Sequence, residues 1–210
     1  MIVVRAIFLN PGEVISPLSK QAGFIEVGCY PLRWDELCEA VVRDLKAASF
    51  SAHVNGEVMQ AKAAKCLGNL GNALQAITDG KGDTGAYMNQ IQREAKVVWA
   101  AAGIDFEGRE VFWERRRRSG EMVNRVPGFE NPKWGGSSWQ SLARGSGTVE
   151  AEELNGDVVR LGAYVKIPTP YNQLLVRLAT QMADNREPPG KFSADDLMAM
   201  IPPHRREALL

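Results

Sequence analysis

Helical spacing of apolar residues dominates the sequence from Glu57 to its last residue, and this feature most constrains the fold. Pro170 suits the first turn of a helix, and Ser193 with Asp196 resembles a capping box. The sequence therefore predicts a mainly α protein. The expected helices span 57–78, 84–102, 137–144, 151–165, 170–185 and 193–201, with one more running from Asp105 through the arginines at 115–118.

The first fifty residues carry a different pattern, in which short apolar stretches rich in β-branched residues are separated by turn residues. Three such strands and one helix are too few for an open sheet with both faces covered. We expect residues 1–54 to be the remnant of an α/β domain and residues 55–210 to form a helical domain. The expected strands are 2–8, 24–30 and 51–54, and the expected helix is 34–48.

Composition and charge exclude several classes of protein. Hydrophobic residues make up 45% of the chain and charged residues 24%, which is ordinary for a globular protein. The 25 basic and 25 acidic residues balance, so no overall charge favours nucleic acid or an anionic membrane. The N-terminal apolar stretch is too short for a membrane span and lacks a signal-peptide cleavage pattern. We therefore expect a cytoplasmic protein without nucleic-acid or membrane partners.

Metal-ligating residues are few and scattered along the chain. Cys29, Cys38 and Cys66 form no CxxC pair, and the two histidines, His53 and His204, are far apart in the sequence. Such cysteines are more typical of reduced, buried small hydrophobes than of a disulfide or a metal site. The sequence therefore predicts no metal site.

A polar stripe marks the first long helical stretch. At 100° per residue, Lys65, Asn69 and Asn72 fall on one face of a continuous helix whose other faces are largely apolar. Such a stripe needs buried partners or a polar ligand, and partial burial would lower the pKa of the lysine toward that of a proton donor. A solvent-facing stripe on an ordinary amphipathic helix is an equally good reading of the pattern.

Two serines and one glutamate stand at the starts of later helices. Ser137 and Ser138 follow two glycines, so their hydroxyls either cap a short helix or bind an anion. Glu150 precedes the helix that contains Asn155 and Gly156, where a negative charge is favourable at a helix N-terminus. The pattern alone assigns neither feature to a ligand.

Together these segments resemble one family. The pattern Lys65-x3-Asn69-x2-Asn72-Ala-Leu is similar to the catalytic helix of the ketopantoate reductases. The stretch SSWQSLARGSGTVEAEELNGDVVRLG, then IPTPYNQLL, is similar to that family's paired serines, glutamate, Asn-Gly and Pro-x-Asn. PGEVISPLSKQAGFIEVG resembles the last strands of the family's cofactor domain. The resemblance implies a helical C-terminal domain of the 6-phosphogluconate-dehydrogenase-like type, with a small α/β remnant before it.

The resemblance also implies roles for individual residues. Lys65 corresponds to the lysine that donates a proton to the substrate carbonyl, and Glu150 would hold the active geometry beside it. Asn69 and Asn72 would bind the hydroxyl and keto groups, and Ser138 the carboxylate. The two asparagines are three residues apart rather than four, and residues 139–141 depart from the family pattern. Both departures bear on whether the substrate is ketopantoate, the pantothenate precursor, or a related 2-keto acid.

The family's cofactor, NADPH, has no recognisable site in the sequence. The only GxGxxG pattern, GKGDTG at 80–85, follows a helical stretch rather than a strand, so we expect a helix–helix loop there. The chain would then be the substrate-side half of a reductase, working as a homodimer or with a separate cofactor-domain chain. The alternative is a non-catalytic remnant, or an oligomerisation or small-acid-binding module.

The run of arginines at 115–118 has two interpretations. Cations at a helix C-terminus complement the helix dipole, and a solvated helix end is the expected role. A contact with a nucleotide phosphate or nucleic acid is the alternative. Between Ser119 and Gly136 the sequence predicts a polar loop.

Overall fold

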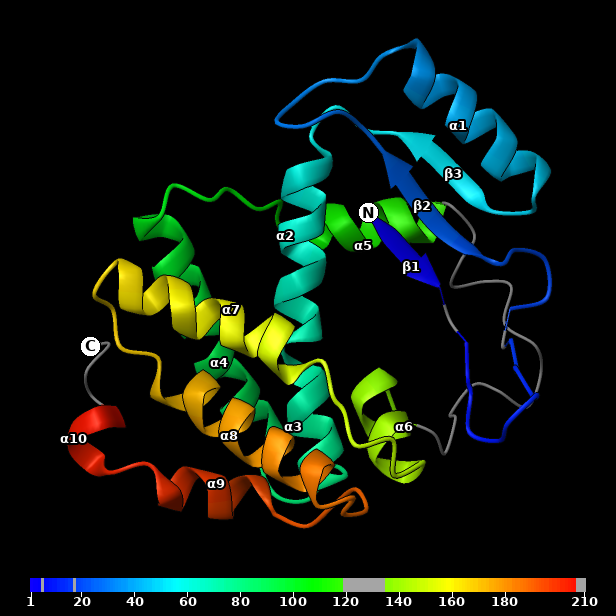
Figure 1. The fold of residues 1–210 in the computed structure, drawn as a ribbon. Coiled ribbons are helices and arrows are strands. Elements are labelled where there is room, and N and C mark those ends of the chain that lie inside the picture. Colours follow the sequence, from blue (N-terminus) through cyan, green and yellow to red (C-terminus); the bar gives the residue numbers. More distant parts are fainter. Residues whose placement is uncertain (5, 17, 119–134, 207–210) are drawn as a thin grey trace. The chain divides into compact units, whose positions relative to one another are not determined.

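The computed structural model describes residues 1–4, 6–16, 18–118 and 135–206 (Figure 1). Contacts divide the chain into two compact units. The first comprises Met1–Lys65 and Asp105–Pro132, and the second comprises Cys66–Ile104 and Lys133–Leu210. Helices predominate and the described strands form one small sheet, which confirms the predicted fold class. The predicted domain boundary after residue 54 stays a prediction.

The sheet of the first unit has three strands, β1 (Ile2–Val4), β2 (Gly23–Val27) and β3 (Ser51–Val54), in that order. β1 pairs with β2 antiparallel and β2 pairs with β3 in parallel, so that Ile25 stands between Ile2 and Ala52. The strand predicted at 51–54 is confirmed. The first predicted strand is shorter than expected, because its pairing with β2 ends at Val4 and Ile7 instead forms an isolated antiparallel bridge with Ile15.

Helix α1 (Glu36–Ala47) connects β2 to β3 and contacts both strands. Asp35 caps its first turn by accepting a hydrogen bond from the Cys38 N–H (2.9 Å). The residues that pack between helix and sheet are apolar, as one buried face of a small α/β layer requires. They are Ile25, Val42 and Ala52, with Val27, Leu45, Phe50 and Val54 around them.

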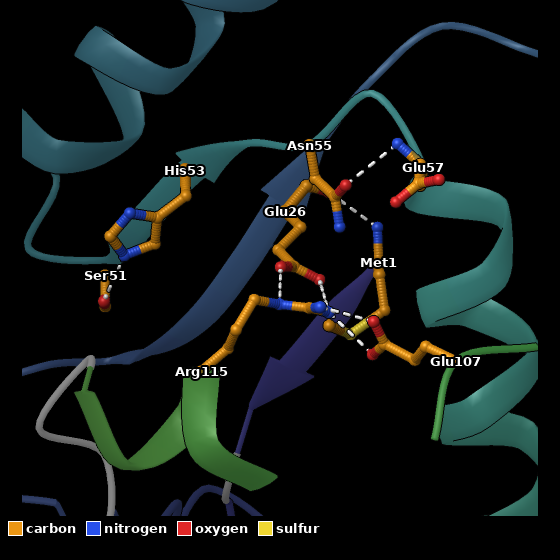
Figure 2. A network of polar contacts seen from close by, with 8 residues as sticks. All are labelled: Met1, Glu26, Ser51, His53, Asn55, Glu57, Glu107 and Arg115. Atoms are coloured by element: carbon orange, nitrogen blue, oxygen red, sulfur yellow. Dashed lines mark hydrogen bonds and ion pairs between the residues drawn. The ribbon is translucent and has the colours of Figure 1, made fainter. Parts of the chain in front are cut away.

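Helix α5 (Arg109–Arg118) contacts β2 through one buried ion pair (Figure 2). The Arg115 Nε and Nη2 atoms donate to the two carboxylate oxygens of Glu26 (2.7 and 3.2 Å), whose side chain is only 2% exposed. Arg115 also donates to both oxygens of Glu107. The solvated helix end predicted for the arginine run is therefore wrong for Arg115, although Arg118 is exposed and pairs with Glu114 in the preceding turn.

The long helix predicted over 57–78 is two helices, α2 (Val58–Asn69) and α3 (Gly71–Thr78), separated at Leu70. The Asn155 side chain donates a hydrogen bond to the Leu70 carbonyl (3.1 Å) at this point. A Cβ atom on residue 71 would lie 2.9 Å from the Met88 sulfur, so a larger residue there requires the flexible Met88 side chain to move. The break places Asn72 on a different helix from Lys65 and Asn69, and the single-helix stripe is wrong in that respect.

The second unit packs α3 and α4 (Thr84–Ala101) against the later helices α6 (Ser137–Ala143), α7 (Ala151–Tyr164), α8 (Pro170–Asp184) and α9 (Ala194–Met200). A one-turn helix, α10 (Pro203–Arg206), follows. The predicted first-turn proline of α8 and the Ser193–Asp196 capping box are both confirmed. The core is formed by fully buried side chains, among them Leu74, Ile77, Tyr87, Ile91, Val98, Val158, Leu175, Met182 and Leu197.

Two further differences concern the segment around α5. Asp105 was expected to start this helix, but α5 begins at Arg109, with Gly108 accepting from the Phe112 N–H (3.1 Å). Most of the predicted polar loop, residues 119–134, lies outside the described residues. Among the helices that are described, none combines the length and apolar character needed to cross a membrane.

The Glu26–Arg115 pair generates a stability prediction. Replacing Arg115 by methionine leaves the buried Glu26 carboxylate without its cation, so we expect the free energy of unfolding to fall by about 2–3 kcal/mol. The matched control is Arg118→Met, because Arg118 is 77% exposed and its pair contributes at most about 0.5 kcal/mol. Urea unfolding followed by circular dichroism measures both. Equal losses in the two variants would contradict a structural role for the buried pair.

Candidate functional site

Helix α6 begins against α3, beside the predicted site residue Asn72. The Gly136 N–H donates to the Gln75 side-chain oxygen (2.7 Å). A Cβ on residue 136 would lie 3.3 Å from both the Asn72 and the Gln75 side-chain oxygens, so both side chains lie close to the backbone at this position. One turn further along α3, Asp79 accepts a hydrogen bond from the indole of Trp139 (2.9 Å). Asn72 and Gln75 therefore lie next to the start of α6.

The two serines at the start of α6 have different environments. Ser137 is exposed, and its hydroxyl donates to a carboxylate oxygen of Glu150 (3.0 Å). Ser138 is 1% exposed, and its hydroxyl has no hydrogen-bond partner among the described residues. Gly136 is the capping residue and no side chain caps the helix, so the expectation that a serine caps it is wrong. Ser137 thus holds Glu150, and Ser138 keeps an unused polar atom.

Glu150 stands at the residue preceding α7, as the sequence predicted. Its carbonyl accepts the first hydrogen bond of the helix, from the Leu154 N–H (3.1 Å), while its carboxylate reaches back to Ser137. The side chain is exposed, so one face of the carboxylate stays open to solvent. Glu150 is accordingly held at one point only and is accessible to a ligand.

Lys65 and Asn69 both lie on α2, four residues and therefore one turn apart on the same face. Both side chains are partly buried. The structure thus keeps this pair together by helix geometry alone, while Asn72 is carried by α3. The sequence analysis missed one neighbour of the predicted residues, Gln75, and it named Ser137 only as a possible helix cap or anion ligand. Gln75 follows Asn72 by three residues, a spacing that could have revealed it, but nothing in the paired serines distinguishes one from the other.

The Asn-Gly and Pro-x-Asn motifs contribute to one buried polar network in the helical unit. Asn155 donates to the Asn172 side-chain oxygen (2.9 Å) as well as to the Leu70 carbonyl. Asn172 in turn donates to Glu94 (2.6 Å) and to the Ile91 carbonyl (3.1 Å). Asn155, Asn172 and Glu94 are each fully buried. The network therefore joins α4, α7 and α8 to the residue that precedes α3.

Glu94 caps α8 from another helix. Its two carboxylate oxygens accept the N–H groups of Tyr171 (2.8 Å) and Asn172 (2.9 Å), which are the first two N–H groups of a helix that starts with proline. Thr169, the residue at the cap position, makes no such bond. Burial raises the pKa of Glu94 to about 7, against the opposing effect of these hydrogen bonds. The carboxyl group is thus a buried acid that titrates near neutrality.

The described residues do not fit a dinucleotide pyrophosphate. The turn from β2 to α1 carries Asp35, Glu36 and Glu39 at the helix start, where three carboxylates repel phosphate. In the turn from β3 to α2, the Glu57 N–H is already occupied by the Asn55 side chain (2.9 Å). GKGDTG, at residues 80–85, connects α3 to α4, which confirms the predicted helix–helix loop.

Comparisons with known proteins agree with this helical arrangement. The family profile "Ketopantoate reductase PanE/ApbA C terminal" matches residues 57–183. No curated protein matches the chain. Among solved structures, a PanE/ApbA family ketopantoate reductase from Ralstonia eutropha JMP134 is 26% identical, with a TM-score of 0.64 over 89% of this chain and 59% of that one.

Two further solved structures share the fold. A D-mandelate dehydrogenase in complex with NADH and anilino(oxo)acetate is 19% identical, with a TM-score of 0.66 over 88% of this chain and 59% of that one. A dimeric ketopantoate reductase from Staphylococcus aureus is 18% identical, with a TM-score of 0.58 over 88% of this chain and 62% of that one. The present chain thus spans about three fifths of the length of the structures that it matches.

The raised pKa of Glu94 generates a pH-dependence prediction. The ordinary pKa is 4.5 and the folded value about 7, so this group's contribution to stability is complete below pH 4.5 and is lost as the pH rises through 7. We expect the free energy of unfolding to fall by roughly 3 kcal/mol across this window. In Glu94→Gln this group's fall should disappear, because a carboxamide does not titrate in this range. Urea unfolding at several pH values tests this, and an unchanged pH slope in the variant would contradict it.

Proposed function

We propose a function for this chain from its family: it belongs to the ketopantoate reductase PanE/ApbA family through its C-terminal domain. In this proposal the chain is the substrate-side part of a reductase of ketopantoate or a related 2-keto acid. The observation that carries the proposal is the Ser137–Glu150 hydrogen bond at the start of α6, beside Asn72. It brings an accessible carboxylate, hydroxyls and carboxamides of the family's motif together within one compact unit.

In this proposal Lys65 donates a proton to the carbonyl oxygen of the substrate as the carbonyl carbon is reduced. A cation beside this oxygen stabilises the alkoxide that develops in the transition state. Lys65 is partly buried on α2 and lies one turn before Asn69, so the proposed proton donor and a proposed substrate ligand share one face of this helix. Glu150 holds the active geometry, and its hydrogen bond from Ser137 fixes one of its oxygens.

Substrate binding is assigned to Asn69, Asn72 and Ser138. The asparagines would bind the hydroxyl and keto groups through their carboxamides. A substrate carboxylate would give the Ser138 hydroxyl the acceptor that it lacks among the described residues, and a buried hydroxyl without a partner costs about 1–3 kcal/mol. Gln75 is less available, since its side-chain oxygen already accepts the Gly136 N–H.

When bound, a nicotinamide cofactor, NADPH in this proposal, would supply the hydride. The described residues do not fit its pyrophosphate, so we assign its binding to residues other than these, either on a separate cofactor-domain chain or in further sequence of the same protein. Residues 1–54 are then the last part of a cofactor domain and 55–210 the substrate domain. An NADH-bound structure of the same fold and a dimeric relative support a nicotinamide partner and a homodimer, respectively. We place the protein in the cytoplasm, in pantothenate biosynthesis.

A ligand-binding measurement tests the assignment of Lys65. We expect Lys65→Ala to weaken ketopantoate binding by about tenfold or more in isothermal titration calorimetry, because a charge-assisted hydrogen bond is lost. The matched control is Lys62→Ala, which removes an exposed lysine from the preceding turn of α2 and should leave the affinity unchanged. Equal affinities in the wild type and both variants would overturn the site assignment.

A cofactor titration tests whether the described residues bind NADPH, and it bears on whether the chain is part of a reductase or a non-catalytic module. NADPH fluorescence should show no saturable binding to the chain alone, with or without ketopantoate. The carboxylates at the start of α1 repel a pyrophosphate, and the Glu57 N–H at the start of α2 is already bound by Asn55. Saturable binding would contradict the assignment of the cofactor to other residues. If ketopantoate binds and no cofactor domain restores turnover, the chain is instead a non-catalytic small-acid-binding module.

A further inference from the structure

Three metal-ligating side chains meet where β2 leads into α1. The sulfur atoms of Cys29 and Cys38 lie 3.6 Å apart. With a carboxylate oxygen of Asp35, all three ligand atoms fall within 4.8 Å of one another. The cysteines are nine residues apart in the sequence, which is why their spacing did not reveal the cluster. Neither the residues matched by the family profile nor the proposed substrate site includes them.

The backbone brings these ligands together without help from a metal. The Cys29 N–H donates to the Arg33 carbonyl (2.8 Å), and the Arg33 N–H donates to the Gly56 carbonyl (2.7 Å), so the turn is closed on itself and tied to the chain beyond β3. Asp35 caps α1 by accepting the Cys38 N–H with one oxygen (2.9 Å). The same cap that starts the helix therefore fixes Asp35 and Cys38 relative to each other.

The geometry matches a tetrahedral zinc site. Two thiolates bound to one Zn²⁺ at about 2.3 Å each, with a tetrahedral angle between them, are about 3.8 Å apart. The observed separation of 3.6 Å is close to this value, whereas a disulfide requires about 2.05 Å. Two cysteines and one carboxylate suit Zn²⁺, while Mg²⁺ and Ca²⁺ prefer oxygen ligands throughout.

The ion also has a route to the cluster. Asp35 is exposed and Cys29 is partly exposed, while Cys38 is buried behind them. Three protein ligands leave one position of a tetrahedron open to solvent, as in zinc sites that keep a bound water. We propose that Cys29, Asp35 and Cys38 bind one Zn²⁺ ion, the two thiols releasing their protons to solvent on binding.

Cobalt titration of the full chain tests the proposal. With a non-thiol reductant present, Co²⁺ bound by thiolates gives a near-ultraviolet charge-transfer absorption, and added Zn²⁺ should abolish it by displacement. We expect Cys29→Ser and Cys38→Ser each to weaken binding by about tenfold or more. The matched control is Cys66→Ser, which changes the third cysteine of the chain, on α2, and should leave the titration unchanged.

Asp35→Asn distinguishes a ligand from a structural cap. Asparagine caps a helix as well as aspartate does, so α1 should keep its stability by circular dichroism while the metal affinity falls. The proposal is overturned if the wild type gives no charge-transfer band, if Cys29→Ser binds Co²⁺ as tightly as the wild type, or if Cys66→Ser abolishes the band. A chain that binds no Co²⁺ but forms a Cys29–Cys38 disulfide without reductant would overturn it as well.

Discussion

One buried carboxyl group links three helices of the helical unit through a polar network. Glu94 sits on α4 with no exposed surface and takes up the first two N–H groups of α8, a helix whose own cap residue leaves them unbound. The arrangement exchanges the cost of burying a carboxyl group for the cost of burying two unpaired N–H groups. Asn172 and Asn155 extend the same network to Leu70, so α7 and the start of α3 are hydrogen-bonded to the residues around this carboxyl group. The helices next to Asn72 and Glu150 are therefore held by buried polar groups that are not part of the proposed site.

The first unit uses the opposite solution for a buried carboxylate. Glu26 keeps its charge and is paired with Arg115, which also binds Glu107, so that a helix distant in sequence is joined to the central strand of the sheet. In one unit a carboxyl group is accommodated by N–H donors and a raised pKa, and in the other by a cation with two acidic partners. Neither Glu26 nor Glu94 is part of the proposed site. The partners of each carboxyl group explain why a residue type that usually lies in solvent is buried here.

Much of the fold could be predicted because local signals and tertiary packing agree. The β3 strand, the first-turn proline of α8 and the Ser193 capping box all depend on residues within a few positions of each other. The failures arise where a distant residue decides. Nothing near Leu70 signals that Asn155 will bind its carbonyl, nothing near Arg115 signals Glu26, and the nine-residue interval between Cys29 and Cys38 hides a 3.6 Å contact. For the site, the motif named Asn72, Ser138 and Glu150, but only the three-dimensional structure separates the exposed Ser137 from the buried Ser138.

Gly71, at the start of α3, also bears on which substitutions this sequence tolerates. Replacing glycine by alanine is the simplest step by which drifting sequences lengthen and straighten their helices. Here an alanine would place its methyl group 2.9 Å from the Met88 sulfur, so this step requires the Met88 side chain to move. Packing against Met88, rather than contact with a ligand, therefore opposes this substitution at the start of α3.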